Sequence, residues 1–98
     1  MKLVKSLKES LQEKKPYLFW RWEIDDLEWL LEQAISLQDP VIVDEILKYY
    51  DFDVLKDVMI NQLYYSHNTL FAKRKYDKVF NYMIWKVYQK KAPKTWTL

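Results

Sequence analysis

The sequence predicts an all-α fold, a single small bundle of four to five helices spanning residues 1–98. Along most of the chain, apolar residues recur at spacings of three and four, as they do on the buried side of an amphipathic helix. No segment alternates apolar and polar residues between turn glycines, and the chain contains no glycine at all. With 98 residues the chain is long enough for one modest core and too short for two domains.

The first predicted helix covers residues 1–15. Leu3, Leu7 and Leu11 recur every four residues, so they share one side of this helix. Pro16 ends the helix because the residue before a proline is pushed out of helical backbone geometry. Loose attachment to the rest of the domain is an alternative that the sequence leaves open for this helix.

The second and third helices are predicted from their starting residues. Asp25 is expected to cap the second helix, with Glu28 three residues later completing a capping box. Asp39 and Pro40 favour the start of the third helix, because aspartate suits the cap and proline the first helical turn. The expected buried residues are Leu27, Leu30, Leu31, Ala34 and Ile35 in the second helix and Val43, Ile46, Leu47 and Tyr50 in the third.

A fourth helix is expected after Asp51 or Asp53, either of which can cap it. The polar residues 66–69 predict a turn, and the last helix is expected over residues 69–91. Residues 92–98 are expected to form a flexible tail. The expected buried residues are Leu55, Val58, Met59, Gln62 and Leu63 in the fourth helix and Tyr76, Val79, Phe80, Met83, Ile84, Val87 and Tyr88 in the last.

The composition excludes several kinds of chemistry. Without glycine the chain can form neither a P-loop nor a dinucleotide fingerprint, and its helices are expected to end on asparagine, aspartate or bound water. Without cysteine it can form no disulfide, cysteine-based zinc site or thiol nucleophile. The single histidine, His67, lies beside Ser66 in a predicted turn, which does not make a catalytic triad. We therefore expect no enzyme activity, no cofactor and no metal site.

The N-terminal residues and the hydropathy pattern bear on location. The first fifteen residues carry five lysines, and polar residues separate their leucines, unlike the unbroken apolar stretch of a signal peptide. No run approaches the roughly 20 apolar residues of a membrane span. The sequence therefore predicts a cytoplasmic protein that makes no membrane contact.

Charge is divided into blocks along the chain. The net charge is +4 over residues 1–22, −9 over residues 23–57, zero over residues 58–71 and +7 over residues 72–98. One interpretation is that acidic and basic helix sides lie beside each other and neutralise each other. The other interpretation is that one block faces a charged partner.

Aromatic residues make up 17% of the chain and point to binding of another protein. The aromatic run at 17–22 lies between predicted helices, where an amphipathic pattern cannot bury all of it. This run could fold back as a plug over the small core or form a contact patch, and the two interpretations are compatible. The candidate protein-binding residues are Phe19, Trp20, Trp22, Asp25, Asp26 and Glu28.

Nucleic-acid binding by the last helix is the alternative, because basic residues interleaved with aromatic rings are typical of such sites. A helix-turn-helix within residues 40–64 is disfavoured, since Asp53 and Asp57 would face the phosphates. A further alternative is a homo-oligomeric structural protein that buries its aromatic residues in a homodimer. The candidate nucleic-acid-binding residues are Lys73, Arg74, Lys75, Tyr76 and Lys78.

Four short stretches and one isoleucine within residues 17–60 together form a characteristic pattern: Leu18-Phe19-Trp20, Ile24-Asp25-Asp26-Leu27, Ile35, Ile46-Leu47-Lys48-Tyr49-Tyr50 and Val54-Leu55-Lys56-Asp57-Val58. This pattern resembles that of a family of small bacterial helical proteins regarded as antitoxin-like partners of nucleotidyltransferase-type toxins. After residue 66 the chain departs from the family, because its last helix is longer, more basic and more aromatic. The resemblance implies a helical fold and a protein partner, and it implies no site residues.

Together these features predict a non-enzymatic regulatory protein-interaction module, antitoxin-like or inhibitor-like in type. The partner would be a toxin or another enzyme, contacted by the aromatic anchors and by the acidic middle block. A phage-type inhibitor of a nucleic-acid enzyme would use the same acidic block to imitate a phosphate backbone.

Overall fold

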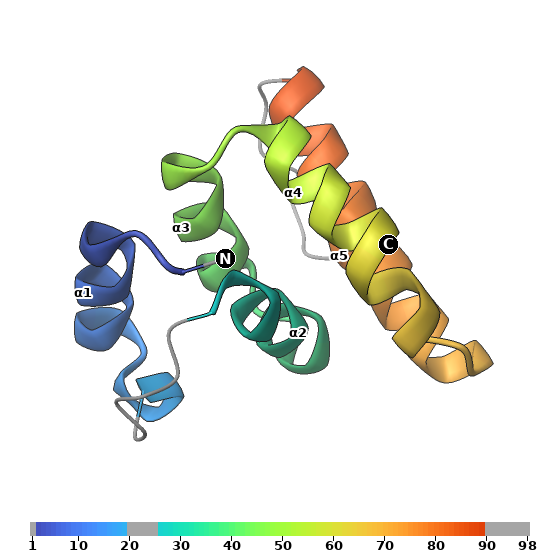
Figure 1. The fold of residues 1–98 in the computed structure, drawn as a ribbon, viewed down its shortest axis with the longest axis horizontal. Coiled ribbons are helices and arrows are strands. Elements are labelled where there is room, and N and C mark those ends of the chain that lie inside the picture. The colour runs from blue at the N-terminus through green and yellow to red at the C-terminus, as the bar shows by residue number, and fades with distance from the viewer. Residues whose placement is uncertain (1, 20–25, 90–98) are drawn as a thin grey trace.

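The computed structural model describes residues 2–19 and 26–89, and over those ranges the protein is all-α, which confirms the predicted fold class (Figure 1). None of the described helices has the length and apolar character needed to cross a membrane. Three short helical segments of other types accompany the α-helices: η1 (Pro16–Phe19), η2 (Met59–Leu63) and η3 (Tyr64–Ser66). The α-helices of the described ranges are α1 (Lys5–Lys14), α2 (Leu27–Leu37), α3 (Pro40–Tyr49), α4 (Phe52–Val58) and α5 (Leu70–Gln89).

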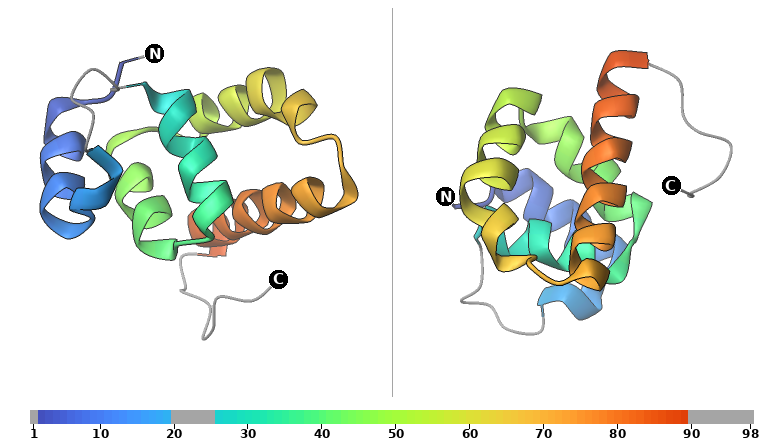
Figure 2. Two further views of the ribbon diagram at one scale, coloured as in Figure 1. Left: turned by 90° about the horizontal axis from the view of Figure 1, so that it is seen from below. Right: turned by 90° about the vertical axis from the view of Figure 1, so that its right-hand side faces the viewer.

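The helices are arranged around α2 and α3 in the middle of the molecule. On one side α1 packs against α3, and on the other side α5 packs against α2 and α3. Figure 2 shows α4, η2 and η3 running alongside α5 in the opposite direction, so that these segments form a long helical hairpin. The turn of this hairpin projects from one end of the molecule, far from α1 (Figure 1).

Aspartate side chains begin α2 and α3, but the residue that caps α2 is not the predicted one. Asp39 accepts a hydrogen bond of 2.9 Å from the Val41 backbone N–H, as expected. In α2 the cap is Asp26, whose carboxylate accepts from the Glu28 N–H at 3.3 Å. The prediction of Asp25 as the cap is wrong by one residue, because the helical backbone begins at Leu27 and only the residue before it can reach that N–H.

The end of α2 shows how a chain without glycine terminates a helix. Gln38 adopts the left-handed conformation, with φ of 55°, which glycine normally occupies at this position. Its side-chain amide donates hydrogen bonds to the carbonyls of Ile35 at 2.7 Å and of Lys75 at 3.2 Å. The expected asparagine, aspartate or water is therefore replaced by a glutamine that also ties α2 to α5.

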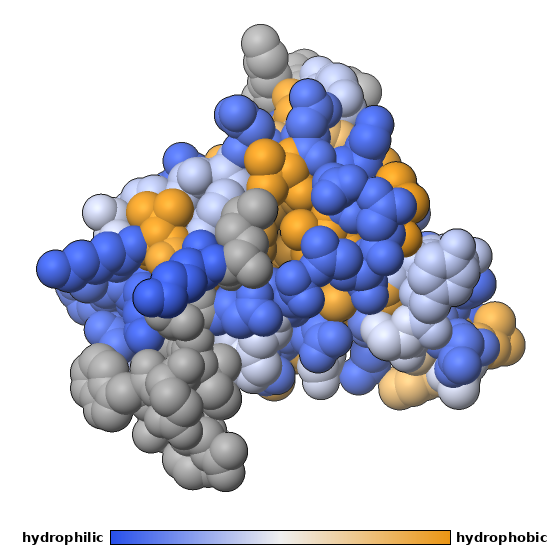
Figure 3. Space-filling model, in the orientation of Figure 1, coloured by the Kyte–Doolittle hydropathy of each residue, from blue (hydrophilic) through white to orange (hydrophobic). Residues whose placement is uncertain are grey.

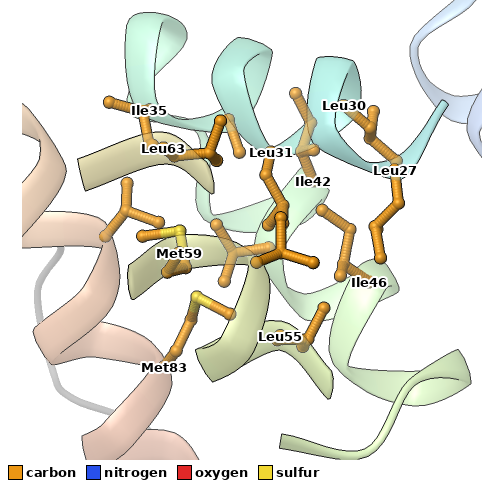
Figure 4. Packing of buried hydrophobic residues seen from close by; sticks show 14 of the residues in the cluster. Leu27, Leu30, Leu31, Ile35, Ile42, Ile46, Leu55, Met59, Leu63 and Met83 are labelled. Atoms are coloured by element: carbon orange, nitrogen blue, oxygen red, sulfur yellow. The ribbon is translucent and has the colours of Figure 1, made fainter. Parts of the chain in front are cut away.

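The core lies where α2, α3, α4 and η2 meet α5 (Figure 4). Every buried residue predicted for α2 is confirmed, as are the apolar residues predicted for the fourth helix, whereas Gln62 is exposed. In α3 the buried side consists of Ile42, Val43, Glu45 and Ile46, while Leu47 and Tyr50 are only half-buried. The prediction placed the buried residues of α3 along a single side of the helix. In the structure this helix is covered on two sides, by α1 and by α2 with α5.

The buried side of α5 is rotated from the predicted one. Tyr76, Val79 and Met83 are buried as expected, but Tyr82 joins them, and the predicted core residue Tyr88 is 64% exposed. The remaining predicted core residues of α5, namely Phe80, Ile84 and Val87, are half-buried. The reason is that α5 packs on α2 and α3, which extends its buried side to Tyr82. Near its end, the helix runs past most of its neighbours.

The first helix is fixed to the domain by burial. Leu7 and Leu11 are fully buried and Leu3 is nearly so. The Tyr50 hydroxyl accepts from the Val4 N–H at 2.9 Å and lies 3.3 Å from the Lys2 carbonyl, which joins the start of the chain to the end of α3. The tail predicted at residues 92–98 lies outside the described residues.

Candidate protein-interaction surface

The acidic middle block is paired in part with the basic blocks at both ends of the chain. Among the described residues, Glu45, Asp39 and Asp44 form ion pairs, and pairs with Lys14 and Lys86 link α1 and α5 to α3. The interpretation of mutual neutralisation applies to these groups. The pairs are Lys14–Glu45 at 3.0 Å, Lys48–Glu45 at 2.6 Å, Lys15–Asp39 at 2.8 Å and Lys86–Asp44 at 3.3 Å.

Glu45 is the buried charge of this network, with an exposed fraction of only 3%. Burial raises its pKa, but hydrogen bonds from Lys48, Ser10 and Lys14 together outweigh that effect and lower the pKa to about 2. Both carboxylate oxygens are engaged, since Ser10 donates to Oε1 at 2.6 Å and the two lysines donate to Oε2. The cluster therefore joins α1 to α3.

Most of the candidate protein-binding residues have side chains outside the part of the chain that the structure describes. Trp20, Trp22 and Asp25 lie outside the described residues, and so does the side chain of Phe19. Of the two remaining candidates, Asp26 caps α2, as described above, and Glu28 is half-buried in its first turn. Binding by Phe19, Trp20, Trp22 and Asp25 stays a prediction.

The structure places the five candidate nucleic-acid-binding residues in different environments. Tyr76 is only 2% exposed and its hydroxyl donates to the Met59 carbonyl at 2.6 Å, so its ring cannot stack on a base. The prediction of Tyr76 as a stacking residue is therefore wrong. Lys73 donates to the Tyr64 hydroxyl at 2.9 Å and Lys75 to the Ser36 carbonyl at 3.2 Å. Of the five, only Arg74 and Lys78 are exposed and have no hydrogen bond or ion pair within the described ranges.

The sequence analysis assigned no candidate site to the end of the α4–α5 hairpin, where the structure exposes an apolar surface. Tyr65 is 77% exposed, Leu70 71% and Phe71 70%, the highest values among the large apolar residues that the structure describes. Tyr64 lies beside them at 40%. Figure 3 shows apolar and weakly polar side chains gathered at this end of the molecule, at the lower right. We refer to Tyr64, Tyr65, Leu70 and Phe71 as the hairpin-end patch.

Two lysines hold rings of the hairpin-end patch in place. Lys73 Nζ lies 4.4 Å from the centre of the Tyr64 ring, and Lys75 Nζ lies 4.9 Å from that of Phe71. Tyr64 also meets Tyr65 edge to face, with their centroids 5.4 Å apart. The exposed aromatic side chains are therefore ordered before any partner arrives, which lowers the entropy lost on binding.

An irregular helix leads into the turn of the hairpin. The segment η2 is a π-helix, a wider form of helix that is rare and is frequently found at functional sites. The Leu63 carbonyl at its end accepts from Ser66 Oγ at 2.9 Å and from His67 Nδ1 at 2.7 Å. These two side chains stabilise the turn after η2, and Thr69 Oγ1 then caps α5 by accepting from the Ala72 N–H at 3.1 Å.

One signal in the sequence could have revealed the hairpin-end patch. Residues 58–71 contain no charged side chain, although they include two apolar pairs, Tyr64-Tyr65 and Leu70-Phe71, on either side of a polar turn. Two adjacent residues of a helix cannot both face the same core. An uncharged segment with such pairs at a helix end therefore predicts exposed apolar side chains.

Comparison with family models, with curated proteins and with solved structures finds no match for this chain. Within residues 2–19 and 26–89, no three histidine, aspartate or glutamate side chains are grouped closely enough to hold a metal ion.

Proposed function

We propose that this protein is a non-enzymatic interaction module that binds another protein through the hairpin-end patch. The observation that supports this proposal is the exposure of Tyr65, Leu70 and Phe71, each at 70% or more, at a single projecting end of the molecule. Contiguous exposed apolar side chains cost free energy in water and usually mark a surface that a partner covers.

The kind of side chain also favours a protein partner. Tyrosine is among the residues that contribute most to binding energy at protein interfaces, and phenylalanine is enriched there. The polar turn at residues 66–69 lies between the apolar pairs, so a covering surface must accept hydroxyl, imidazole and amide groups together with apolar ones. Protein surfaces provide this mixture of apolar and hydrogen-bonding groups.

A regulatory role of antitoxin-like or inhibitor-like type is the finer part of the proposal. It is supported by the resemblance of residues 17–60 to the antitoxin-like family and by the lack of a catalytic arrangement in the sequence. The predicted anchors Phe19, Trp20 and Trp22 would then form a second contact with the same partner.

Site-specific photo-crosslinking tests the proposal. A benzophenone amino acid is placed at Phe71 in the full chain, the chain is irradiated in the source cells, and the crosslinked partner is identified and purified. Binding of that purified partner is then measured with the unmodified protein and with the Leu70→Ser/Phe71→Ser variant. We expect the variant to bind at least about tenfold more weakly, because two apolar anchors are lost.

The matched control is Tyr88→Ser, which removes an exposed ring near the other end of α5, where its side chain is 64% exposed. This variant should bind the purified partner with the affinity of the unmodified protein. Crosslinks only to nucleic acid, or equal binding by both variants, would contradict the proposal.

A further inference from the structure

The outward side of α5 continues the hairpin-end patch as one stripe. Leu70, Arg74, Lys78 and Asn81 follow one another at spacings of four, four and three, which places them along one side of an α-helix. Asp77 lies in the same stripe, and all five side chains are exposed. Of these residues, Arg74, Asp77, Lys78 and Asn81 line a shallow hollow of about 430 Å³ on the helix surface.

The stripe carries two cations and one carboxylate, a net charge of +1, and the two cations are available. Arg74 and Lys78 lie one helical turn apart and form no ion pair or hydrogen bond with any residue of the described structure. This differs from Lys73 and Lys75, which are held by Tyr64 and by the Ser36 carbonyl, as described above. The N-terminus of α5 adds partial positive charge at the same end of the stripe.

We infer that this α5 stripe docks into a groove on an acidic protein, an inference that rests on the proposed function and names the chemistry of its partner. Leu70, with Phe71 beside it, would enter an apolar pocket, while Arg74 and Lys78 pair with carboxylates on the groove's edge. An exposed helix side with an apolar anchor followed by cations at i+4 and i+8 matches the binding of a helix in a groove. Arginine pairs especially well with a carboxylate, because its guanidinium donates two parallel hydrogen bonds.

Other occupants fit the stripe less well. A second copy docked stripe to stripe would set two net positive stripes against each other, and this net repulsion opposes symmetric association. A lipid surface would have to bury the polar turn at residues 66–69, which costs free energy in hydrocarbon. Nucleic acid would find the Tyr76 ring, which was predicted to stack on bases, sealed in the core.

Peptide selection tests this inference with defined probes. Random peptides displayed on phage are selected on the full-length protein, and the selected sequences are synthesised for measurements of Kd by fluorescence polarisation. We expect sequences in which aspartate or glutamate alternates with large apolar residues. Arg74→Glu/Lys78→Glu should weaken their binding at least about tenfold, and peptides with lysine in place of the acidic residues should regain affinity for this variant.

Two controls separate the inference from the proposed function. Lys2→Glu/Lys5→Glu changes the net charge by the same amount on exposed side chains near the start of the chain, and it should leave Kd unchanged. If Leu70→Ser/Phe71→Ser abolishes binding while Arg74→Glu/Lys78→Glu does not, the interaction module stands and the acidic partner is wrong. If neither variant affects binding, or no peptide is selected, both the proposed interaction module and its acidic partner are contradicted.

Two further probes test the class of partner. The protein is titrated with phosphatidylserine vesicles and, separately, with a short polyuridine RNA, at low and at physiological salt. We expect no binding at physiological salt. Binding to either probe that Arg74→Glu/Lys78→Glu removes would overturn the protein partner in favour of a lipid surface or a nucleic acid.

Discussion

At the scale of single residues, the buried charge of Glu45 links stability to pH. Its pKa is about 2 in the folded protein, against an ordinary value of 4.5. Because the folded-state pKa is lowered, the ionised group stabilises the fold above about pH 4.5, and this contribution disappears as the pH falls toward 2. The contribution amounts to as much as about 3 kcal/mol of the free energy of unfolding.

We therefore expect Glu45→Gln to lower the free energy of unfolding at pH 7 by roughly 1–3 kcal/mol, because hydrogen bonds to a charged group are lost. The variant should also lose less stability than the unmodified protein between pH 5 and pH 3. Urea denaturation at these pH values measures both effects. Glu32→Gln, which changes an exposed glutamate of α2, is the control and should behave like the unmodified protein.

Tyr76 gives a second prediction for a single residue, at the alkaline end of the pH range. Burial raises its pKa to about 12, and the nearby charge of Asp77 and the neighbouring Tyr64 add to the effect. The folded protein thus favours the neutral phenol, so this stabilisation is present below pH 10 and is lost as the pH rises from 10 to 12.

Tyr76→Phe should cost about 1 kcal/mol at pH 7, because the hydrogen bond to the Met59 carbonyl is lost and that carbonyl is left without the hydroxyl. It should also reduce the decline in stability between pH 10 and pH 12. Thermal unfolding followed by circular dichroism measures both, with Tyr65→Phe on the surface as the control. A steeper alkaline decline in the variant would contradict this account.

At the scale of elements, the sequence predicted the existence of each α-helix and the residues that α2 buries. It failed where burial depends on the neighbours. Glu45 is polar and so was not assigned to the core, although α1 covers it and supplies Ser10 and Lys14 as partners. Tyr82 was not among the predicted core residues of the last helix, although α3 provides Asp44, which accepts from its hydroxyl at 2.7 Å. Such pairings join residues more than 30 positions apart, which local periodicity does not reveal.

The end of α2 provides a prediction at the same scale. A residue other than glycine pays roughly 1 kcal/mol to adopt the left-handed conformation of Gln38, and here two side-chain hydrogen bonds offset that cost. Gln38→Ala keeps the conformational cost and loses both hydrogen bonds, whereas Gln38→Gly loses the bonds and removes the cost. We expect both variants to be less stable than the unmodified protein, with the glycine variant about 1 kcal/mol more stable than the alanine variant. Urea denaturation gives the order, and equal stability of the two variants would contradict this explanation.

At the scale of the whole molecule, the charge blocks were visible in the sequence, but their pairing was not. The structure uses part of the acidic block to hold α1 and α5 against α3, and within residues 2–19 and 26–89 it gives Arg74 and Lys78 no ion-pair partner. The hairpin-end patch was also not predicted, because only the arrangement of α4, η2 and α5 shows that Leu70 and Phe71 lie beyond the core. Where the core ends is a property of the assembled bundle, and the pattern of a single helix does not define it.

Substitution of two leucines, one in the core and one in the proposed binding surface, tests where the core ends. Leu11 lies in α1 and is fully buried, whereas Leu70 begins α5 and is 71% exposed. Leu11→Ala should lower the free energy of unfolding by about 2–5 kcal/mol, because it removes buried apolar area and leaves a cavity. Leu70→Ala should change it by less than about 0.5 kcal/mol, since the side chain is already in water, while weakening the binding of the selected peptides. Urea denaturation and fluorescence polarisation on the same two variants provide the comparison. A large loss of stability in Leu70→Ala would mean that this leucine belongs to the fold, and the hairpin-end patch would then lose one of its anchors.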